Sequence, residues 1–291
     1  MKTTVSDWLE GARLRTLPAA AAPVLAGAGL AYAGEGFSFP RVALALAVAL
    51  LLQIGVNFSN DYSDGVRGTD DFRTGPPRLT GGGKVSAKVV LAVALGCFAA
   101  AAVLGLLLVA LTGRWWLLGL GLAAIVAAWF YTGGKHPYGY MGIAEIFVFV
   151  FFGLMATVGT VYVCLLSAPF GSWLVGAGMG LYSCALLMVN NIRDIPTDRQ
   201  AGKKTLAVRL GEARARRTYV GYLVLAPVCI GVGLAGHVLA IVAAVVLEVC
   251  GLISCLPVVR GARGHSLLQV LTRTGQLTLA AGVVTLLVAL L

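Results

Sequence analysis

Two polar stretches of this sequence begin directly after long apolar runs. They read Asn57-Phe-Ser-Asn60-Asp61-Tyr-Ser-Asp64-Gly-Val-Arg67-Gly-Thr-Asp70-Asp71 and Asn190-Asn191-Ile-Arg193-Asp194-Ile-Pro-Thr-Asp198-Arg199. Together they contain six of the 12 acidic residues of the chain. In each stretch an asparagine precedes an aspartate by four residues, a spacing that places both side chains on one face of a helix. Each stretch can therefore direct an amide and a carboxylate into a common space.

The residue types in these stretches indicate a magnesium–phosphate site. Carboxylates that converge in one place repel one another unless a cation lies between them. Oxygen ligands without His or Cys favour a hard cation such as Mg²⁺, which typically binds one or two carboxylates together with substrate phosphates. The Arg and Lys residues beside the acids are good phosphate ligands. The alternative interpretation is that both stretches are solvated loops with local ion pairs.

The composition is that of an integral membrane protein. Of the 291 residues, 59% are hydrophobic and 12% are charged, and the mean hydropathy is +0.90, whereas soluble domains carry about 25% charged residues. The net charge of +10 could suggest nucleic acid, but the basic residues lie between apolar runs and are typical of topology signals. The six cysteines lie within apolar runs and form no CxxC pair, so we interpret them as buried apolar residues.

A bilayer core about 30 Å thick requires about 20 apolar residues in a helix, and the sequence predicts nine such spans. They cover approximately residues 16–34, 40–59, 87–112, 115–132, 143–165, 170–190, 215–235, 237–256 and 271–291. The expected fold is therefore an all-α bundle of nine transmembrane helices around a central cavity. Because no linker or low-complexity segment interrupts it, residues 1–291 are expected to form a single domain.

The distribution of Lys and Arg predicts the orientation of the bundle. With nine spans, 20 of the 22 basic residues fall on the same side as the N-terminus, and the exceptions are Arg41 and Arg114. The positive-inside rule then places the N-terminus and both polar stretches in the cytoplasm and the C-terminus outside. We expect the two stretches to face each other across the cavity.

The first span ends in a sequence that mimics a signal-peptide cleavage site, Ala31-Tyr-Ala33-Gly34. Acidic residues in the preceding segment, Asp7 and Glu10, and prolines within the run, Pro18 and Pro23, argue against a signal peptide. We therefore interpret this run as a membrane helix.

Three motifs resemble those of the UbiA-type intramembrane prenyltransferases: Asn60-Asp61-x-x-Asp64, Asp194-x-x-x-Asp198, and Tyr131-x-x-x-Lys135 between them. Within that superfamily the chain is most similar to the 1,4-dihydroxy-2-naphthoate polyprenyltransferases of menaquinone synthesis. The segments that carry this second resemblance are Arg13-Leu-Arg15-Thr16-Leu17-Pro18, Asn57-Phe-Ser-Asn60-Asp61-Tyr-Ser-Asp64-Gly, Gly75-Pro76-Pro77-Arg78-Leu79, Asn190-Asn191-Ile-Arg193-Asp194 and Gly202-Lys203-Lys204-Thr205-Leu206-Ala207-Val208-Arg209-Leu210-Gly211.

One position departs from the broad superfamily pattern, in which a third aspartate follows Asp64 by four residues. Here that position is Gly68, and the next acids are Asp70 and Asp71, either of which is a candidate replacement.

The resemblance implies Mg²⁺-dependent transfer of a polyprenyl group from an isoprenoid diphosphate to 1,4-dihydroxy-2-naphthoate, with loss of the acceptor carboxylate. The candidate metal ligands are Asp61, Asp64, Asp70, Asp71, Asp194 and Asp198. The resemblance gives catalytic roles to four of these (Asp61, Asp64, Asp194 and Asp198) and to Tyr131 and Lys135. The candidate substrate-binding residues are Arg13, Asn57, Asn60, Arg67, Arg78, Asn190, Asn191, Arg193, Lys203 and Lys204.

Other functions are consistent with parts of this pattern. The same chemistry could act on a different acceptor, such as 4-hydroxybenzoate, a chlorin, a haem or a phosphoribosyl group. An ion-coupled transporter is disfavoured because transporters bind ions near the bilayer midplane, and a membrane scaffold requires no paired acidic stretches. We expect a multi-pass protein of the inner (cytoplasmic) membrane whose partners are the two substrates and membrane lipid, with no nucleic acid and no obligate protein partner.

Overall fold

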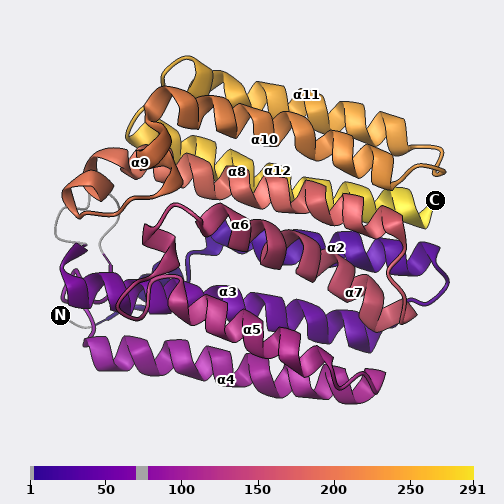
Figure 1. Cartoon of the computed structure of the whole chain (residues 1–291), viewed down its shortest axis with the longest axis horizontal. Helices are drawn as coiled ribbons and strands as arrows, with labels where there is room; N and C mark the ends of the chain where they lie inside the picture. The colour runs from indigo at the N-terminus through magenta and orange to yellow at the C-terminus, as the bar shows by residue number, and fades with distance from the viewer. Residues whose placement is uncertain (1–2, 70–77) are drawn as a thin grey trace.

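The computed structural model describes residues 3–69 and 78–291 as an elongated bundle of helices that run roughly parallel to one long axis (Figure 1). The two chain ends lie at opposite ends of this bundle (Figure 1). The elements are α1 (Val5–Ala12), η1 (Leu14–Thr16), α2 (Pro18–Ala33), α3 (Phe39–Arg67), α4 (Ala87–Thr112), α5 (Leu117–Phe130), η3 (Tyr138–Tyr140), α6 (Ala144–Val148), the π-helical η4 (Phe149–Met155), α7 (Ala156–Leu165), α8 (Phe170–Gln200), α9 (Leu206–Leu210), α10 (Glu212–Gly233), α11 (Ala240–Val259) and α12 (His265–Leu290). The prediction of an all-helical membrane protein is confirmed.

The count of nine spans is only partly matched by the helices. In the described part of the chain, six helices are long and apolar enough to cross a membrane, or seven if α1–η1 and α2, which meet at a bend of 51°, form one span. At 14 residues, α5 is about 21 Å long, which is shorter than the hydrocarbon core. The 22-residue α10 is long enough to cross a membrane but not apolar enough, because its first turns carry Glu212, Arg214, Arg216 and Arg217.

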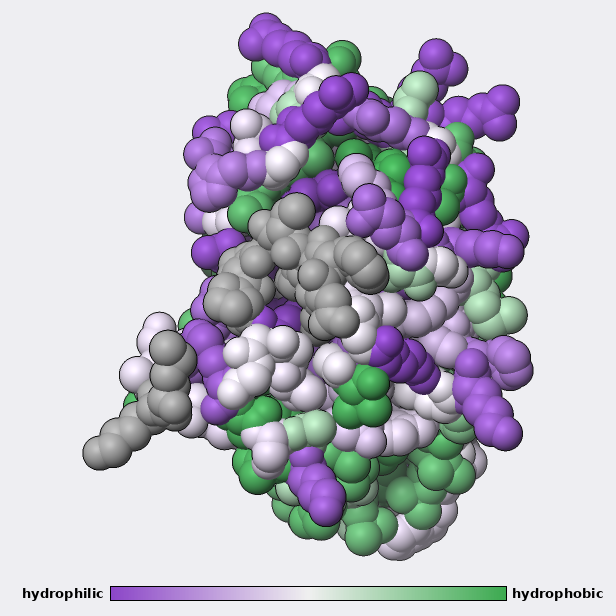
Figure 2. Space-filling model, turned by 90° about the vertical axis from the view of Figure 1, so that its left-hand side faces the viewer, coloured by the Kyte–Doolittle hydropathy of each residue, from purple (hydrophilic) through white to green (hydrophobic). Residues whose placement is uncertain are grey.

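Helices α3 and α8 are the longest elements, with 29 and 31 residues. Both continue past their apolar runs, so the two polar stretches are largely helical rather than loops. Helix α3 ends where Gly68 adopts a left-handed conformation with φ of 70°, a common way to terminate a helix. Helix α8 continues through Pro196 and ends at Gln200. Both polar ends reach the same end of the bundle (Figure 1), where hydrophilic side chains gather on the surface (Figure 2).

At the opposite end, Arg41 ties three helices together. This residue lies in the first turn of α3, and its guanidinium donates hydrogen bonds to the carbonyls of Val163 (2.9 Å), Cys164 (3.4 Å) and Leu111 (2.9 Å). These carbonyls belong to the last turns of α7 and α4, which have no partner further along their own helices. The positive charge also suits the negative end of the helix dipole.

Small residues allow some helices to touch through their backbones, as is common in membrane bundles. A Cβ added to Gly153 in η4 would lie 2.6 Å from the carbonyl oxygen of Gly176 and 2.7 Å from the backbone nitrogen of Gly180, both in α8. Backbone atoms cannot move aside as a flexible side chain can. The spacing between η4 and α8 therefore requires glycine at position 153.

We expect Gly153→Ala to lower the free energy of unfolding of the purified protein by about 1–3 kcal/mol, because the added methyl group forces η4 and α8 apart. Thermal unfolding in detergent measures this effect. Gly119→Ala in α5 is the control, because its Cβ would meet nothing within 4 Å. Equal stability of the two variants would contradict the proposed backbone contact.

Candidate active site

A cavity of about 940 Å³ runs between the helices that carry the polar stretches. Its polar part is lined by the last turns of α3 and α8. Its apolar part is lined by earlier residues of α3, such as Ala49 and Leu52. Small and aliphatic residues of α2, α4, α5 and α7 complete this part, among them Gly105, Gly121 and Gly159. The cavity thus combines a charged end with a long apolar interior.

The two polar stretches meet at the charged end. Asp61 and Asp64 from α3 line the same cavity as Asp194 and Asp198 from α8. Asp198 interacts electrostatically with both Asp64 and Asp194. Acidic residues of the two stretches therefore line one cavity. The alternative of solvated loops is wrong, because Asp61, Asp64 and Asp198 are buried.

Asp64 is paired with a cation. Its Oδ2 atom lies 3.1 Å from Nζ of Lys203, and its Oδ1 atom accepts a hydrogen bond from the hydroxyl of Tyr140. The Lys203 ammonium also lies 4.6 Å from the centroid of the Tyr140 ring, within the range of a cation–π contact. Burial by itself lowers the pKa of Lys203, but the nearby carboxylates of Asp64 and Asp198 outweigh it and the pKa is raised. Lys203 therefore stays protonated at neutral pH.

The carboxylates of α8 have partners within their own segment. Arg193 binds Asp194 through two parallel hydrogen bonds of 2.7 and 2.6 Å. Asp198 accepts a longer contact of 3.4 Å from the hydroxyl of Thr205. The backbone N–H of Lys203 donates to the carbonyl of Asp198 at 2.8 Å, which folds the segment after α8 back over the cavity.

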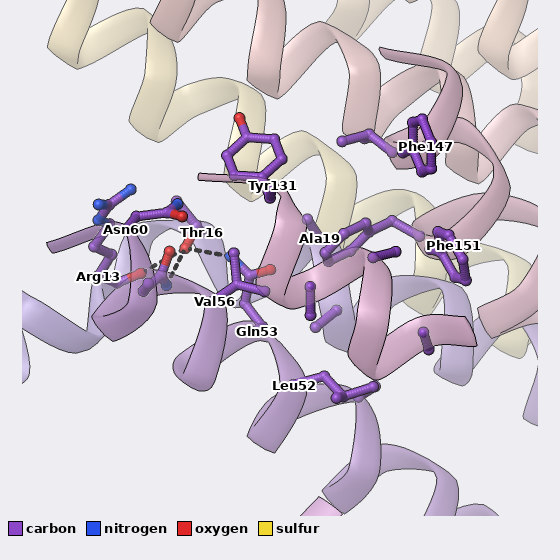
Figure 3. A pocket seen from close by; sticks show the side chains of 18 of the residues that line it. Arg13, Thr16, Ala19, Leu52, Gln53, Val56, Asn60, Tyr131, Phe147 and Phe151 are labelled. Atoms are coloured by element: carbon purple, nitrogen blue, oxygen red, sulfur yellow. Dashed lines mark hydrogen bonds between the residues drawn. The ribbon is translucent and has the colours of Figure 1, made fainter. Parts of the chain in front are cut away.

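Thr16 of η1 and Gln53 and Asn57 of α3 form a polar network at the cavity wall, and Figure 3 shows the contact between Thr16 and Gln53. The Thr16 hydroxyl accepts hydrogen bonds from the side-chain amides of Gln53 (2.9 Å) and Asn57 (3.0 Å), and it donates to the carbonyl of Arg13 (2.9 Å). Arg13 has a left-handed backbone with φ of 52°, which is strained for a residue with a side chain. The network therefore holds a strained turn that places Arg13 at the cavity wall.

Two further residues of the expected site, Asn60 and Asp61, accept hydrogen bonds from other parts of the chain. Asn60 accepts a hydrogen bond of 2.7 Å from the hydroxyl of Thr132. Asp61 accepts hydrogen bonds from the backbone N–H groups of Leu79 (2.9 Å) and Thr80 (2.8 Å). These contacts connect α3 to the α5–α6 connection and to the segment before α4.

The structure brings most of the expected residues to the cavity. Apart from the four aspartates, the lining includes Arg13, Asn57, Asn60, Arg78, Tyr131, Asn190, Asn191, Arg193 and Lys203. Lys135 and Lys204 are exposed and are not part of this lining. Arg67 is directed elsewhere, because its guanidinium donates to the carbonyls of Thr132 and Gly134. Asp70 and Asp71 lie outside the described residues.

An Mg²⁺ site was predicted here, and the donor set fits that ion. In the ranges 3–69 and 78–291, no three Asp, Glu, His or Cys side chains are arranged to hold a metal by themselves. Mg²⁺ usually completes its octahedron with water and substrate phosphate rather than with a full set of protein ligands. Oxygen donors on two facing helix ends, Asp64 on one and Asp194 and Asp198 on the other, suit that mode of binding.

Sequence reasoning missed several lining residues. Gln53 precedes Asn57 by four residues, so it continues the polar face of α3 into the apolar run, and this spacing could have identified it. Phe147 and Phe151 also line the cavity, and Phe147 stacks on the ring of Tyr138 at a centroid distance of 3.9 Å. Nothing in the sequence marks Phe147 and Phe151 among the many apolar residues of that span.

Comparison with known proteins assigns the family. Residues 20–260 match the UbiA prenyltransferase family. The chain belongs to the UbiA prenyltransferase family. It is 46% identical over 274 residues to a 1,4-dihydroxy-2-naphthoate octaprenyltransferase of Mycobacterium tuberculosis, a match that covers 93% of this chain and 92% of that protein. An Escherichia coli protein of the same name is 40% identical over 230 residues, or 77% of this chain and 74% of the relative.

Solved structures of UbiA homologues share the fold of this family member. The Archaeoglobus fulgidus homologue bound to DMAPP and Mg²⁺ has a TM-score of 0.68 at 15% identity, and the match covers 97% of this chain and 99% of that one. A homologue from Aeropyrum pernix without ligand has a TM-score of 0.67 at 17% identity, covering 93% and 94%.

We expect Thr16→Val to destabilise this UbiA-family protein by about 1–3 kcal/mol, because the buried amides of Gln53 and Asn57 both lose a hydrogen-bond acceptor. Chemical denaturation followed by circular dichroism measures the change. Thr218→Val is the matched control, since that hydroxyl bonds only to the carbonyl of Arg214 in its own helix. A Thr16 variant as stable as this control would show that the network contributes little.

Proposed function

We propose that this protein transfers a polyprenyl group from a polyprenyl diphosphate to 1,4-dihydroxy-2-naphthoate in the menaquinone pathway. The bond between the prenyl carbon and the diphosphate oxygen breaks, and a new carbon–carbon bond forms to the naphthoate ring. The ring carboxylate leaves as CO₂, diphosphate is released, and the product is demethylmenaquinol. The observation that carries this proposal is the cavity itself, in which two acidic helix ends meet a long apolar interior. The names of the Mycobacterium and Escherichia coli relatives supply the acceptor.

The charged end is suited to a magnesium diphosphate. We assign metal binding to Asp64, Asp194 and Asp198, with Asp70 and Asp71 as further candidates. Asn60, Asn190 and Asn191 would orient these carboxylates or complete the metal shell. A Mg²⁺ ion held by these residues would neutralise charge on the departing diphosphate. The Archaeoglobus fulgidus homologue, whose structure was solved bound to DMAPP and Mg²⁺, supports this choice of metal and prenyl donor.

Cations at the same end are placed to bind the diphosphate. Lys203 and Arg78 line the cavity and both act electrostatically on Asp64. With a metal bound at Asp64, the ammonium of Lys203 would be able to turn toward phosphate oxygens. Arg13, Arg15 and Arg193 add to the positive lining.

The aromatic row is suited to the carbon centre that loses its leaving group. Departure of diphosphate leaves positive charge on the allylic carbon, which aromatic faces stabilise. Tyr131 and Tyr138 pack edge to face at 5.5 Å, and Phe147 continues the row. Burial raises the pKa of Tyr138, so its phenol stays neutral and offers a ring face rather than a base. The apolar interior excludes water that would otherwise capture the cation.

We also propose a nine-span topology in the inner membrane, with the N-terminus and the charged end of the cavity in the cytoplasm. The opposite positions of the two termini support an odd number of crossings (Figure 1). In this arrangement α5 crosses with the help of its flanking residues, and α10 crosses with its apolar second half.

The acceptor is tested by supplying membranes that contain the protein with a polyprenyl diphosphate, Mg²⁺ and one aromatic acid at a time. The expected result is a prenylated, decarboxylated product from 1,4-dihydroxy-2-naphthoate and none from 4-hydroxybenzoate. Product from 4-hydroxybenzoate alone would show that the protein is a prenyltransferase with that acceptor instead of 1,4-dihydroxy-2-naphthoate. Absence of diphosphate release with every acceptor would exclude the proposed function.

We expect Asp64→Asn to raise the Mg²⁺ concentration needed for half-maximal activity by about tenfold or more, because a metal ligand loses its charge. Activity is measured across a Mg²⁺ titration at saturating substrates. Asp7→Asn is the control, since Asp7 pairs with Lys84 and is not part of the cavity lining. An unchanged Mg²⁺ requirement in Asp64→Asn would remove this residue from the metal site.

Lys203 and Mg²⁺ are expected to compete for Asp64. Lys203→Met leaves the buried carboxylate without its cation, so the variant should be less stable than wild type without metal. Added Mg²⁺ should then raise its melting temperature by about 2 °C or more beyond the effect on wild type. The exposed neighbour provides the control, Lys204→Met. The same Mg²⁺ response in all three proteins would contradict the competition.

A further inference from the structure

Asp61 is the first aspartate of the first motif, yet its surroundings differ from those of the other acids in the cavity. Its side chain is completely buried, with 0% of the residue exposed. One carboxylate oxygen accepts the N–H of Leu79 at 2.9 Å, and the other accepts the N–H of Thr80 at 2.8 Å. Hydrogen bonds from N–H groups to a carboxylate are among the stronger ones in proteins. Both oxygens of Asp61 are therefore used to hold backbone.

Two glycines bring this backbone close to α1 and α3. A Cβ on Gly65 would lie 2.7 Å from Cβ of Thr80 and 2.9 Å from the backbone nitrogen of Gly81. A Cβ on Gly11 would lie 2.8 Å from the side chain of Leu79. Leu79 is itself 2% exposed and packs in a small apolar cluster with Ala12, Phe58, Val90 and Ala94. The segment is thus docked on α3 by a carboxylate and by close approach at Gly65, and on α1 by the side chain of Leu79 at Gly11.

The docked segment begins immediately after a residue of the charged end. Arg78 lines the cavity and acts electrostatically on Asp64. Its carbonyl accepts the N–H of Gly82 at 3.0 Å, and the carbonyl of Leu79 accepts the N–H groups of Lys84 and Val85. A tight turn therefore starts at Arg78, and its position depends on where Leu79 and Thr80 are held.

We propose that Asp61 is a positioning residue, which docks the Leu79–Thr80 backbone and thereby fixes Arg78 beside the diphosphate, rather than a ligand of the metal. This inference rests on the proposed function for the identity of the diphosphate. It separates the two aspartates of the first motif by task. Asp64 binds metal, and Asp61 shapes the segment that supplies a cation.

The test compares Asp61→Asn with Asp64→Asn in the full-length protein. An asparagine at position 61 keeps one acceptor but points an amide N–H₂ at the second backbone N–H. We expect the KM for the polyprenyl diphosphate to rise by about tenfold, with the Mg²⁺ concentration for half-maximal activity within about twofold of wild type. Asp64→Asn should show the opposite pattern, a shifted Mg²⁺ requirement.

Gly65→Ala displaces the same segment without changing any carboxylate, and it keeps the inference testable if Asp61→Asn does not fold. It should reproduce the raised KM at an unchanged Mg²⁺ requirement. Gly96→Ala in α4 is the control, because its Cβ would meet nothing within 4 Å. Combined with Arg78→Met, neither Asp61→Asn nor Gly65→Ala should raise the KM further, since both act through Arg78.

Hydrogen exchange of the peptide that contains Leu79 and Thr80 gives a readout that does not depend on activity. It should accelerate in Asp61→Asn and Gly65→Ala and stay at the wild-type rate in Asp64→Asn. An increase of about tenfold in the Mg²⁺ requirement of Asp61→Asn would overturn the inference and make Asp61 a metal ligand. Unchanged exchange in Asp61→Asn would overturn it as well. A wild-type protein that transfers no prenyl group would instead refute the proposed function, and the exchange result would still decide the role of Asp61.

Discussion

The charged end of this protein depends on the balance between buried carboxylates and one ammonium group. Asp64 and Asp198 come from helices far apart in the sequence, and both are largely removed from water. Such a pair is unfavourable without a nearby cation, because burial and like charge both oppose ionisation. Lys203 supplies that cation from the segment after α8, and Tyr140 supports it from the α5–α6 connection. Three parts of the chain are thus drawn together by one electrostatic requirement.

The long helices α3 and α8 make this meeting possible. Each continues beyond its apolar run, so its acids stand on a rigid helix rather than on a loop. A rigid support suits a site that must hold a metal and a diphosphate in fixed positions. The connections that carry Tyr140, Lys203 and Arg78 then close over the helix ends. The fold therefore divides the work between helices, which set the distance between the acids, and connections, which supply the cations.

The sequence predicted the class of fold and most of the lining of the site, because both are written in local patterns. Apolar runs mark the helices, and the four-residue spacing of Asn57 and Asp61 marks a helix face. Two of the expected spans do not stand out by length and apolarity in the described residues, because α5 has only 14 residues and the first turns of α10 are charged. The sequence does not show that Lys203 lines the cavity while its neighbour Lys204 is exposed. Which of them turns inward depends on the path of the chain after α8.

The contacts of Asp61 show the same limit more clearly. Its partners lie 18 and 19 positions later in the chain, and no periodicity connects the two places. Arg67 is similar, because it was expected at the diphosphate and instead binds the carbonyls of Thr132 and Gly134. Long-range contacts of this kind follow from how the chain returns on itself. They are visible only once the bundle is assembled.

The tie made by Arg41 has a consequence for how the molecule can move. Its guanidinium binds the carbonyls at the ends of α4 and α7, so the three helices are joined at the end furthest from the acids. No substrate group is needed to complete these bonds. At the charged end, by contrast, the contact between Lys203 and Asp64 is one that an incoming metal and diphosphate can replace. Binding of substrate should therefore change the distances between helix ends at the charged end of the cavity. The ends of α3, α4 and α7 that Arg41 joins should keep their positions.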